Sequence, residues 1–173
     1  TSKLSGTYQS ARIAAEDFPN VRVVDSRNVS IGSGVLAEYA LQCAEQGMQL
    51  DELTEHLIQK RNDVCLLARL ETLEYLQKGG RISKTAAFAG GMLNIKPVMH
   101  VDNEGHLIKV GTVRGRKNSL KALADKYEAL ALDPENSVIF ISHGDCFEDA
   151  QELADMLKAK GAPDVRLITY VGP

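Results

Sequence analysis

The residues best suited to hold a charged group lie within the first ten positions of the chain. Ser2, Ser5, Gly6 and Thr7 form a hydroxyl- and glycine-rich turn directly before a predicted helix. The first backbone N–H groups of a helix have no partner inside the helix, and together with the helix dipole they attract anions. The turn therefore suits a carboxylate or a phosphate. The alternative is simple capping of the helix by Ser or Thr.

A second hydroxyl- and glycine-rich turn, SIGSG at Ser30–Gly34, precedes another predicted helix. It contains a single GxG and lacks the spacing of a dinucleotide-binding loop, and the chain contains no Walker motif. A nucleotide site is therefore not predicted.

His143 and Asp145, in the sequence ISHGD, follow a predicted strand. The carboxyl ends of strands in open α/β sheets commonly carry functional groups, and this pair could act as acid and base. The alternative is that both are loop residues whose polar groups bond to the backbone. No GxSxG nucleophile elbow is present, and His143 with Cys146 is too small a set for zinc. We therefore predict neither catalytic residues nor metal ligands.

A basic run, RGRK at Arg114–Lys117, enters a predicted helix at the end where cations oppose the helix dipole. With Lys78, Arg81 and Lys84 it could form one cationic surface that binds a partner. The alternative is an ordinary solvated surface.

The composition of the 173-residue chain is that of a globular protein, with 44% hydrophobic and 25% charged residues. The net charge of −3 predicts no nucleic-acid partner and at most transient membrane contact. The cysteines, Cys43, Cys65 and Cys146, are odd in number and far apart, as expected in a reducing compartment. The chain contains no run of about 18 apolar residues, so we expect a soluble, cytoplasmic protein.

The hydrophobic pattern predicts an α/β fold in which strands and helices alternate. Strands are expected at 21–24, 64–69, 98–101, 107–113, 137–142 and 165–170. Helices are expected at 5–16, 35–46, 50–62, 72–77, 84–88, 117–131 and 147–160. Gly47 and Gly161 are expected to end the helices that precede them.

Three features of this pattern bear on the architecture. Val21–Val24, with the helix that follows, is typical of a parallel β/α unit, whereas Asp102–Gly105 is expected to be the turn of a β-hairpin. The apolar run SVIFIS at 137–142 predicts a strand buried on both faces. Pro97 fits only the start or the edge of a strand. A boundary near Asn62–Asp63 would divide a parallel lobe, residues 1–62, from a mixed lobe, residues 63–173.

Seven motifs in this order span almost the whole chain. They are SKLSGTYQSA (2–11), VVDS (23–26), SIGSG (30–34), EYLQKGGRIS (74–83), LNIKP (93–97), VRGRKNSL (113–120) and ISHGD (141–145). Together they resemble the DegV family of bacterial fatty-acid-binding proteins. The resemblance implies two α/β lobes, part of a parallel one and a mixed-sheet one. It also implies that a long-chain acyl tail lies in a tunnel between the lobes.

The resemblance also implies site residues. The fatty-acid carboxylate is expected at the SKLSG turn, with Ser5 as the first choice, Ser2 as the second, and Gly6 beside them. The acyl tunnel is expected near Phe88, Met92 and Ile95. The fatty acid is then a ligand, and no cofactor is expected.

Family members of the FakB type present their bound fatty acid to a separate kinase, so the resemblance implies a carrier and not an enzyme. Arg81, Arg114 and Arg116 would lie on the surface offered to that partner. One alternative is a small-molecule kinase or phosphotransferase subunit that uses the Ser5 turn or His143. Another is an interaction protein without a ligand.

Two family motifs are expected outside the sequence given. A TSQPS-like turn, a second part of the carboxylate site, would precede Thr1, and an HxGPG motif would follow Pro173. The resemblance therefore leads us to expect that this sequence is a piece of a longer chain.

Overall fold

The computed structural model describes residues 1–83 and 94–168, which belong to two compact units. Unit 1 comprises residues 1–66 and 101–108, and unit 2 comprises residues 67–100 and the chain from 109 onward. The predicted lobe boundary at Asn62–Asp63 stays a prediction. The tip of a hairpin, residues 101–108, belongs to unit 1 although its flanking strands continue in unit 2.

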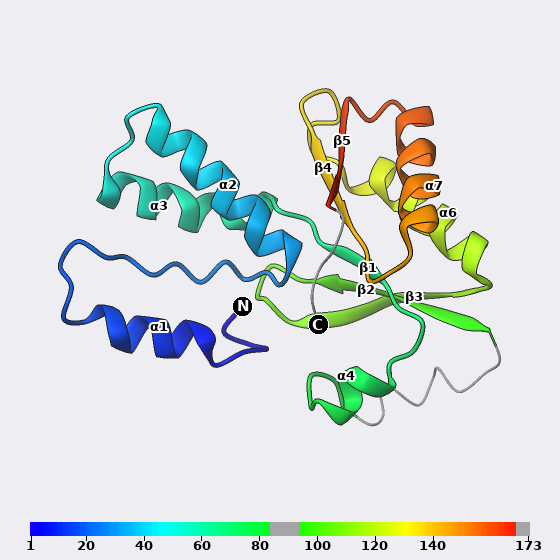
Figure 1. Ribbon diagram of the computed structural model, residues 1–173, viewed down its shortest axis with the longest axis horizontal. Coiled ribbons are helices and arrows are strands. Elements are labelled where there is room, and N and C mark those ends of the chain that lie inside the picture. Colours follow the sequence, from blue (N-terminus) through cyan, green and yellow to red (C-terminus); the bar gives the residue numbers. More distant parts are fainter. Residues whose placement is uncertain (84–93, 169–173) are drawn as a thin grey trace. The chain divides into compact units, whose positions relative to one another are not determined.

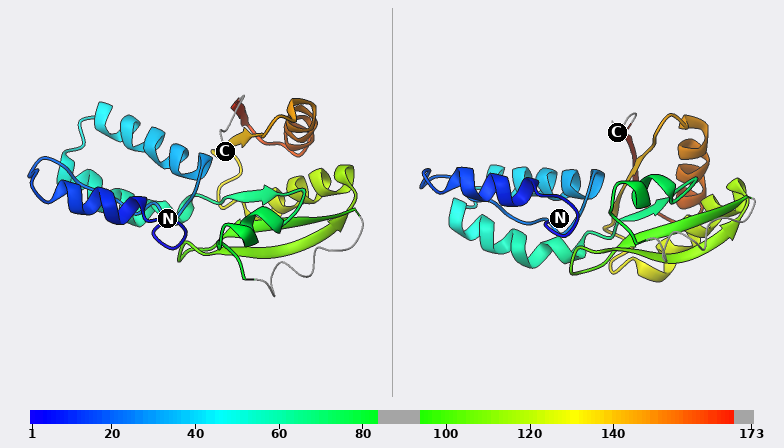
Figure 2. Two further views of the ribbon diagram at one scale, coloured as in Figure 1. Left: turned by 60° about the horizontal axis from the view of Figure 1, so that its bottom comes forward. Right: turned by 90° about the horizontal axis from the view of Figure 1, so that it is seen from below.

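The described chain begins with helices and continues with a mixture of strands and helices, as Figures 1 and 2 show. Their order is α1 (Thr7–Ala15), α2 (Ile31–Glu45), α3 (Leu50–Lys60), η1 (Arg61–Asp63), β1 (Leu67–Arg69), α4 (Glu74–Lys78), β2 (Ile95–Val101), β3 (Leu107–Arg114), α6 (Arg116–Leu130), β4 (Val138–Ser142), α7 (Phe147–Ala159) and β5 (Asp164–Ile168). The α/β class is therefore confirmed. The helix expected at 84–88 lies outside the described residues.

Glycines end α2 and α7 as predicted. Gly47 has a φ of +94°, and its N–H donates to the carbonyl oxygen of Ala44 at 2.9 Å. The N–H of Met48 donates to Cys43 at 3.1 Å. This pair of bonds satisfies carbonyls that a helix end leaves without partners. Gly161, with a φ of +88°, takes the same place after α7.

One strand prediction in unit 1 is wrong. Residues 21–26 form no strand, and no described segment pairs with them; Figure 1 shows them as part of the long connection between α1 and α2. A strand needs hydrogen bonds to a neighbour as well as β-branched residues. Val21–Val24 has the β-branched residues, but no described segment forms a strand ladder with it. The parallel pair that the structure does describe, β4 with β5, lies in unit 2.

The three-stranded sheet of unit 2 has the order β1-β2-β3, with β1 antiparallel to β2. Pro97 lies inside the central strand, which corrects the expectation of a strand start or edge. The Leu70 N–H donates to the Pro97 carbonyl at 3.1 Å, but proline has no N–H to donate in return. The ladder accordingly ends at Arg69, opposite Val98.

The predicted hairpin turn is present between β2 and β3. One carboxylate oxygen of Asp102 accepts the N–H groups of Glu104 at 3.0 Å and His106 at 2.9 Å. The hydrogen bond from His106 lowers the pKa of Asp102 and outweighs the opposing effect of burial. Gly105 has a φ of +89°, which glycine adopts without steric cost. The turn is thus stabilised by its own acidic residue.

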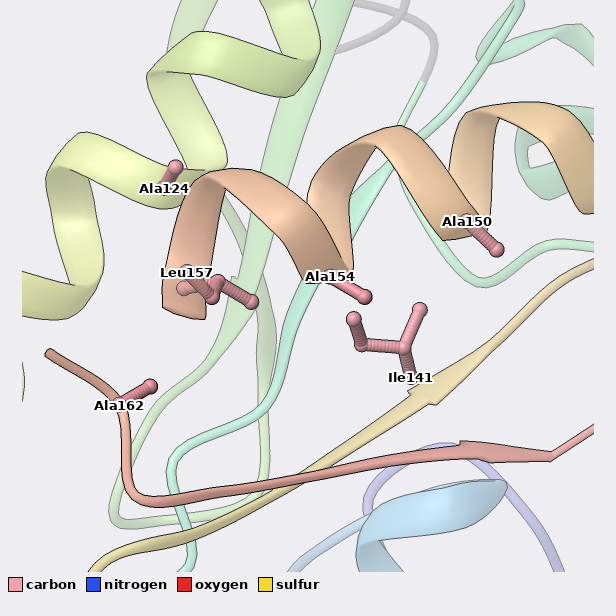
Figure 3. Close-up of a cluster of buried hydrophobic side chains, with 6 residues drawn as sticks. All are labelled: Ala124, Ile141, Ala150, Ala154, Leu157 and Ala162. Atoms are coloured by element: carbon pink, nitrogen blue, oxygen red, sulfur yellow. The ribbon is translucent and has the colours of Figure 1, made fainter. Parts of the chain in front are cut away.

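Unit 2 has a hydrophobic core of small side chains between α6, α7 and the β4–β5 pair (Figure 3). The buried members are Ala124, Ile141, Ala150, Ala154, Leu157 and Ala162. Alanines allow the helix backbones to approach closely. The expectation that β4 is buried on both faces is wrong, because Val138 is 45% exposed and only Ile141 is fully buried. In the described part of the chain, β4 pairs with β5 alone.

Candidate functional site

The predicted carboxylate-binding turn presents two hydroxyls at the start of α1. The Ser5 hydroxyl lies 2.8 Å from the Thr7 hydroxyl and accepts the Thr7 N–H at 3.2 Å. Gly6 is the N-cap, and the first helical bond runs from the Ser10 N–H to the Gly6 carbonyl at 3.0 Å. Ser5, Gly6 and Thr7 are all exposed. The start of α1 therefore combines hydroxyl donors with the positive end of a helix dipole.

Ser2 differs from Ser5 in having an internal carboxylate beside it. Its N–H donates to Asp25 Oδ1 at 3.2 Å, and the Arg27 N–H donates to the same oxygen at 3.0 Å. Burial raises the pKa of Asp25, but hydrogen bonds from the Ser2 hydroxyl and from these two N–H groups outweigh it, so the pKa is lowered. A negative charge beside Ser2 opposes an external carboxylate. Ser5 is therefore the better placed hydroxyl of the two.

Asn28 is a buried polar residue that the sequence did not single out. It is 3% exposed, and its side-chain amide donates to the Val64 carbonyl at 3.1 Å. The backbone carbonyl oxygen of Asn28 accepts hydrogen bonds from the hydroxyls of Ser26 at 3.2 Å and Ser33 at 3.1 Å. These bonds join the loop before α2 to the chain that leads into β1, within unit 1.

The SIGSG turn is built for close packing. Gly32 is buried in the first turn of α2, and a Cβ there would overlap Asn28 Oδ1 and lie 3.0 Å from Leu66 Cδ1. Ser30, directly before α2, has a φ of +48°, a conformation that non-glycine residues rarely adopt. Its side chain makes no cap hydrogen bond. Gly32 is thus required by its contact with Asn28.

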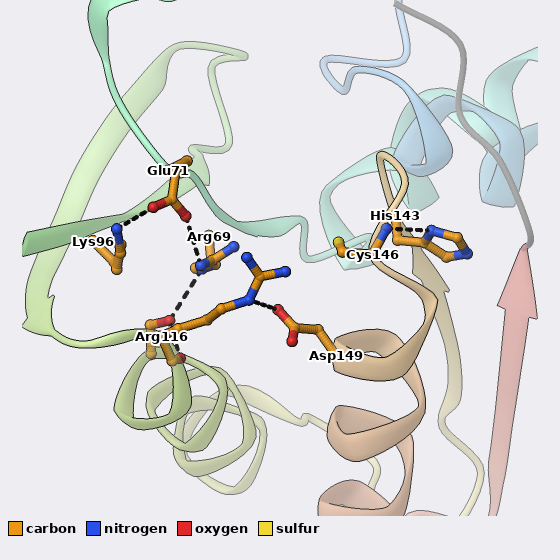
Figure 4. A network of polar contacts seen from close by, with 8 residues as sticks. Arg69, Glu71, Lys96, Arg116, His143, Cys146 and Asp149 are labelled. Atoms are coloured by element: carbon orange, nitrogen blue, oxygen red, sulfur yellow. Dashed lines mark hydrogen bonds and ion pairs between the residues drawn. The ribbon is translucent and has the colours of Figure 1, made fainter. Parts of the chain in front are cut away.

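Unit 2 contains a network of charged residues, drawn in Figure 4, around Glu71. Lys96 forms an ion pair with one carboxylate oxygen of Glu71, and Arg69 Nη2 lies 2.9 Å from the other. Arg69 Nε also donates to Ser119 Oγ at 3.1 Å. The hydrogen bond from Lys96 lowers the pKa of Glu71 and outweighs the effect of burial. The side chains of Arg69 and Lys96 are only 10% exposed, whereas that of Glu71 is 60% exposed.

The three arginines expected on a partner surface have different surroundings. Arg116 Nε donates to Asp149 at 2.6 Å, so this helix-start cation is held by a carboxylate of α7. Arg81 Nη1 donates to the Gly79 carbonyl at 2.5 Å, at the end of α4. Arg114 is exposed, and its guanidinium has no partner within residues 1–83 and 94–168. Arg114 is therefore the one of the three whose guanidinium no described residue holds.

His143 lies in the loop between β4 and α7. Its Nδ1 accepts the Cys146 N–H at 3.2 Å, and its ring packs edge-on against Phe147 at 5.8 Å between centroids. No hydrogen bond joins it to Asp145 in the structure as described, and Asp145 has a φ of +55°. Because Nδ1 is an acceptor, the neutral ring carries its proton on Nε2. Among the described residues, the His143 ring is thus held in the loop by a backbone N–H and has no carboxylate as hydrogen-bond partner.

The residues expected along an acyl tunnel are only partly covered by the structure. Ile95 is the first residue of β2 and is half-buried. Phe88 and Met92 lie outside the described residues. Within the described ranges, no group of three or more His, Cys, Asp and Glu side chains is arranged to hold a metal. In those ranges, too, no helix has the length and the apolar run that a membrane crossing requires.

Known proteins resemble this chain along almost its whole length. The DegV family model, whose description reads "Uncharacterised protein, DegV family", matches residues 1–173. A DegV domain-containing protein of Clostridium perfringens is 39% identical over 178 residues, covering 99% of this chain and 61% of the relative.

Two solved structures show the same fold. One, reported for the fatty acid binding of a DegV family protein from Thermus thermophilus, has a TM-score of 0.83 and 34% identity, covering 96% of this chain and 60% of that one. The other is the Streptococcus pneumoniae Fatty Acid Kinase (Fak) B3 protein loaded with linoleic acid, with a TM-score of 0.86 and 26% identity over 97% of this chain and 62% of that one. The chain thus spans 60 to 62% of the length of these relatives. It belongs to the DegV family.

Proposed function

We propose that the protein binds a long-chain fatty acid and holds its carboxylate at the turn before α1. The observation that carries the proposal is the pair of hydroxyls, Ser5 and Thr7, 2.8 Å apart at a helix start. This turn occurs in a chain similar to proteins solved with fatty acids, among them the linoleic-acid-loaded protein of S. pneumoniae. Ser5 is the primary contact, with Gly6 beside it and Ser2 as a secondary one.

The acyl chain supplies most of the affinity in this proposal. Each buried CH₂ group contributes about 0.8 kcal/mol, so a long tail outweighs a few hydrogen bonds to the head group. We assign the tail to a tunnel near Phe88, Met92 and Ile95. These assignments follow from the resemblance to the family.

The kinase partner is the second part of the proposal. The protein presents the bound carboxylate to a separate fatty acid kinase through a surface that includes Arg81, Arg114 and Arg116. Two observations support this: the similarity to a Fatty Acid Kinase (Fak) B3 protein and the exposed guanidinium of Arg114. The phosphoryl transfer then belongs to the kinase, and the protein is a carrier. Because the kinase uses ATP, the proposal places the protein in the cytoplasm.

Head-group recognition is tested with ligands of equal tail length. The delipidated full-length protein is titrated with a long-chain fatty acid and with the corresponding fatty alcohol. The proposal predicts clearly tighter binding of the acid, because only the acid offers a charged acceptor to the hydroxyls at the start of α1. Equal affinity for the two ligands would contradict carboxylate recognition.

The phosphotransferase alternative is separated from the carrier by replacing His143 with Ala. A carrier keeps its fatty-acid affinity and its competence as a substrate for an added kinase. A phosphotransferase that uses His143 loses turnover while ligand binding persists. The bond from the Cys146 N–H to His143 Nδ1, together with the lack of a described bond to Asp145, favours the carrier.

A further inference from the structure

We propose that Arg69, Lys96 and Arg116 form a binding site for a phosphate group, and that the Glu71 carboxylate occupies this site in the present structure. The inference concerns unit 2 alone. It does not depend on the proposed binding of a fatty acid.

The first argument is the unequal burial of the partners. The side chains of Arg69 and Lys96 are 10% exposed, whereas the side chain of Glu71, which bridges them, is 60% exposed. A buried cation needs a counter-ion, because an unpaired charge away from water is costly. Glu71 supplies that counter-ion from the surface. It can therefore leave into water at little cost if another anion replaces it.

The second argument is the position of Arg116. Figure 4 shows its guanidinium reaching between Arg69 and Asp149. Ser119 joins the two arginines: its hydroxyl accepts Arg69 Nε at 3.1 Å and donates to the Arg116 carbonyl at 2.5 Å. Arg116 also contributes to lowering the pKa of Glu71, after Lys96 and Arg69, so its charge acts at the same place. Arg69 and Lys96 therefore contact the Glu71 carboxylate directly, and the charge of Arg116 acts on the same carboxylate.

The third argument is the match of charge. Asp149 neutralises Arg116 through the 2.6 Å bond to Nε, and the Nη groups of Arg116 have no partner in the ranges that the structure describes. When Glu71 leaves, Arg69 and Lys96 remain without a counter-ion. A phosphate monoester carries close to two negative charges at neutral pH and three strong acceptor oxygens. The planar guanidinium of arginine can bind two phosphate oxygens at once. Arg116 is also the first residue of α6, so the positive end of the helix dipole lies at this position.

The proposal is tested by removing the internal competitor from the full-length protein. We expect the Glu71→Gln variant to bind inorganic phosphate roughly tenfold or more tightly than the wild type in calorimetric titration. Glu74→Gln is the matched control, because Glu74 is 54% exposed and pairs with Lys78, which is not one of the three proposed phosphate ligands. This control should bind phosphate like the wild type.

The cations are tested in the Glu71→Gln background. Adding Arg116→Gln should remove the gain in phosphate affinity, whereas adding Lys117→Gln, a loss of the same charge at an 83% exposed neighbour, should leave it. Equal phosphate affinity in the Glu71→Gln variant and the wild type would overturn the proposal, as would a gain that survives Arg116→Gln. If Glu71→Gln fails to fold, Arg116→Gln alone should lower phosphate affinity relative to Lys117→Gln. No difference between these two would also overturn it.

Two further probes distinguish the source of the phosphate group. Glycerol 3-phosphate represents a soluble monoester, and phosphatidylcholine vesicles with phosphatidic acid, measured by co-sedimentation, represent a lipid head group. Binding in either arm that falls on Arg116→Gln supports the site and identifies its source. Binding in neither arm, or binding unaffected by Arg116→Gln, contradicts it.

Discussion

The Ser5 hydroxyl and the Thr7 hydroxyl lie 2.8 Å apart at the start of α1, and Ser5 Oγ also accepts the Thr7 N–H. A carboxylate at this helix start would receive a hydrogen bond from Ser5. Hydrogen bonds to charged groups contribute about 1.5–3 kcal/mol, so Ser5→Ala should weaken fatty-acid binding by roughly tenfold to a hundredfold. The measurement is a titration of delipidated protein. Ser10→Ala, an exposed hydroxyl within the same helix, is the control and should have no effect. Similar affinities for the two variants would remove Ser5 from the site.

Gly32 and Gly34, two glycines of α2, should respond in opposite ways to alanine. A Cβ at Gly32 would overlap Asn28 Oδ1, so Gly32→Ala should lower the free energy of unfolding by about 1–3 kcal/mol. A Cβ at Gly34 meets nothing within 4 Å, so Gly34→Ala should raise it by about 0.5–1 kcal/mol. Urea unfolding of both variants checks this. An unchanged free energy of unfolding in Gly32→Ala would show that the loop around Asn28 can shift to accommodate the Cβ at little cost.

Arg114→Glu should slow phosphorylation of the bound fatty acid by an added kinase and leave fatty-acid affinity intact. The reason is that Arg114 is exposed and free of described partners, so its charge is available to another protein. Lys109→Glu, the same charge reversal at an exposed position of β3, serves as the control. Equal loss of phosphorylation and of fatty-acid affinity in Arg114→Glu would mean that Arg114 supports the fold or the ligand site instead.

Asp25 should make stability depend on pH. Its pKa in the folded protein is lowered from 3.8, so its contribution is present above the pKa of the unfolded chain and is lost as the pH falls through the folded pKa. The free energy of unfolding should therefore be lower for the Asp25→Asn variant than for the wild type. This difference should be largest near neutral pH and should shrink on acidification below about pH 4. Urea unfolding at a series of pH values measures it. A deficit that is constant with pH would show that the charge of Asp25 has no part in the effect.

Local features of the fold could be predicted from the sequence. Gly47, Gly161 and the Asp102–Gly105 turn act through hydrogen bonds between residues close in the chain, and the structure confirms all three. The predictions for Val21–Val24 and Pro97 were wrong because a segment's role in a sheet depends on which other segment pairs with it. That is a property of register and not of local composition.

The polar networks could not be predicted because their members are distant in sequence. Lys96 and Glu71 are separated by 25 residues, and Arg69 and Ser119 by 50. One signal was present: Lys96 lies in an otherwise apolar strand, and a lysine is rarely buried without a partner. Asn28 gave no such signal, since its loop contains several polar residues. The candidate turn at Ser5 was found because its residues are adjacent.

The central claim, that the protein carries a fatty acid, is tested most directly by denaturing extraction of the purified full-length protein followed by mass spectrometry of the released lipid. The proposal predicts a long-chain fatty acid in stoichiometric amount, and a Ser5→Ala variant purified in parallel should retain less of it. A full-length protein that releases no fatty acid, and that binds none when a fatty acid is added after delipidation, would contradict the claim.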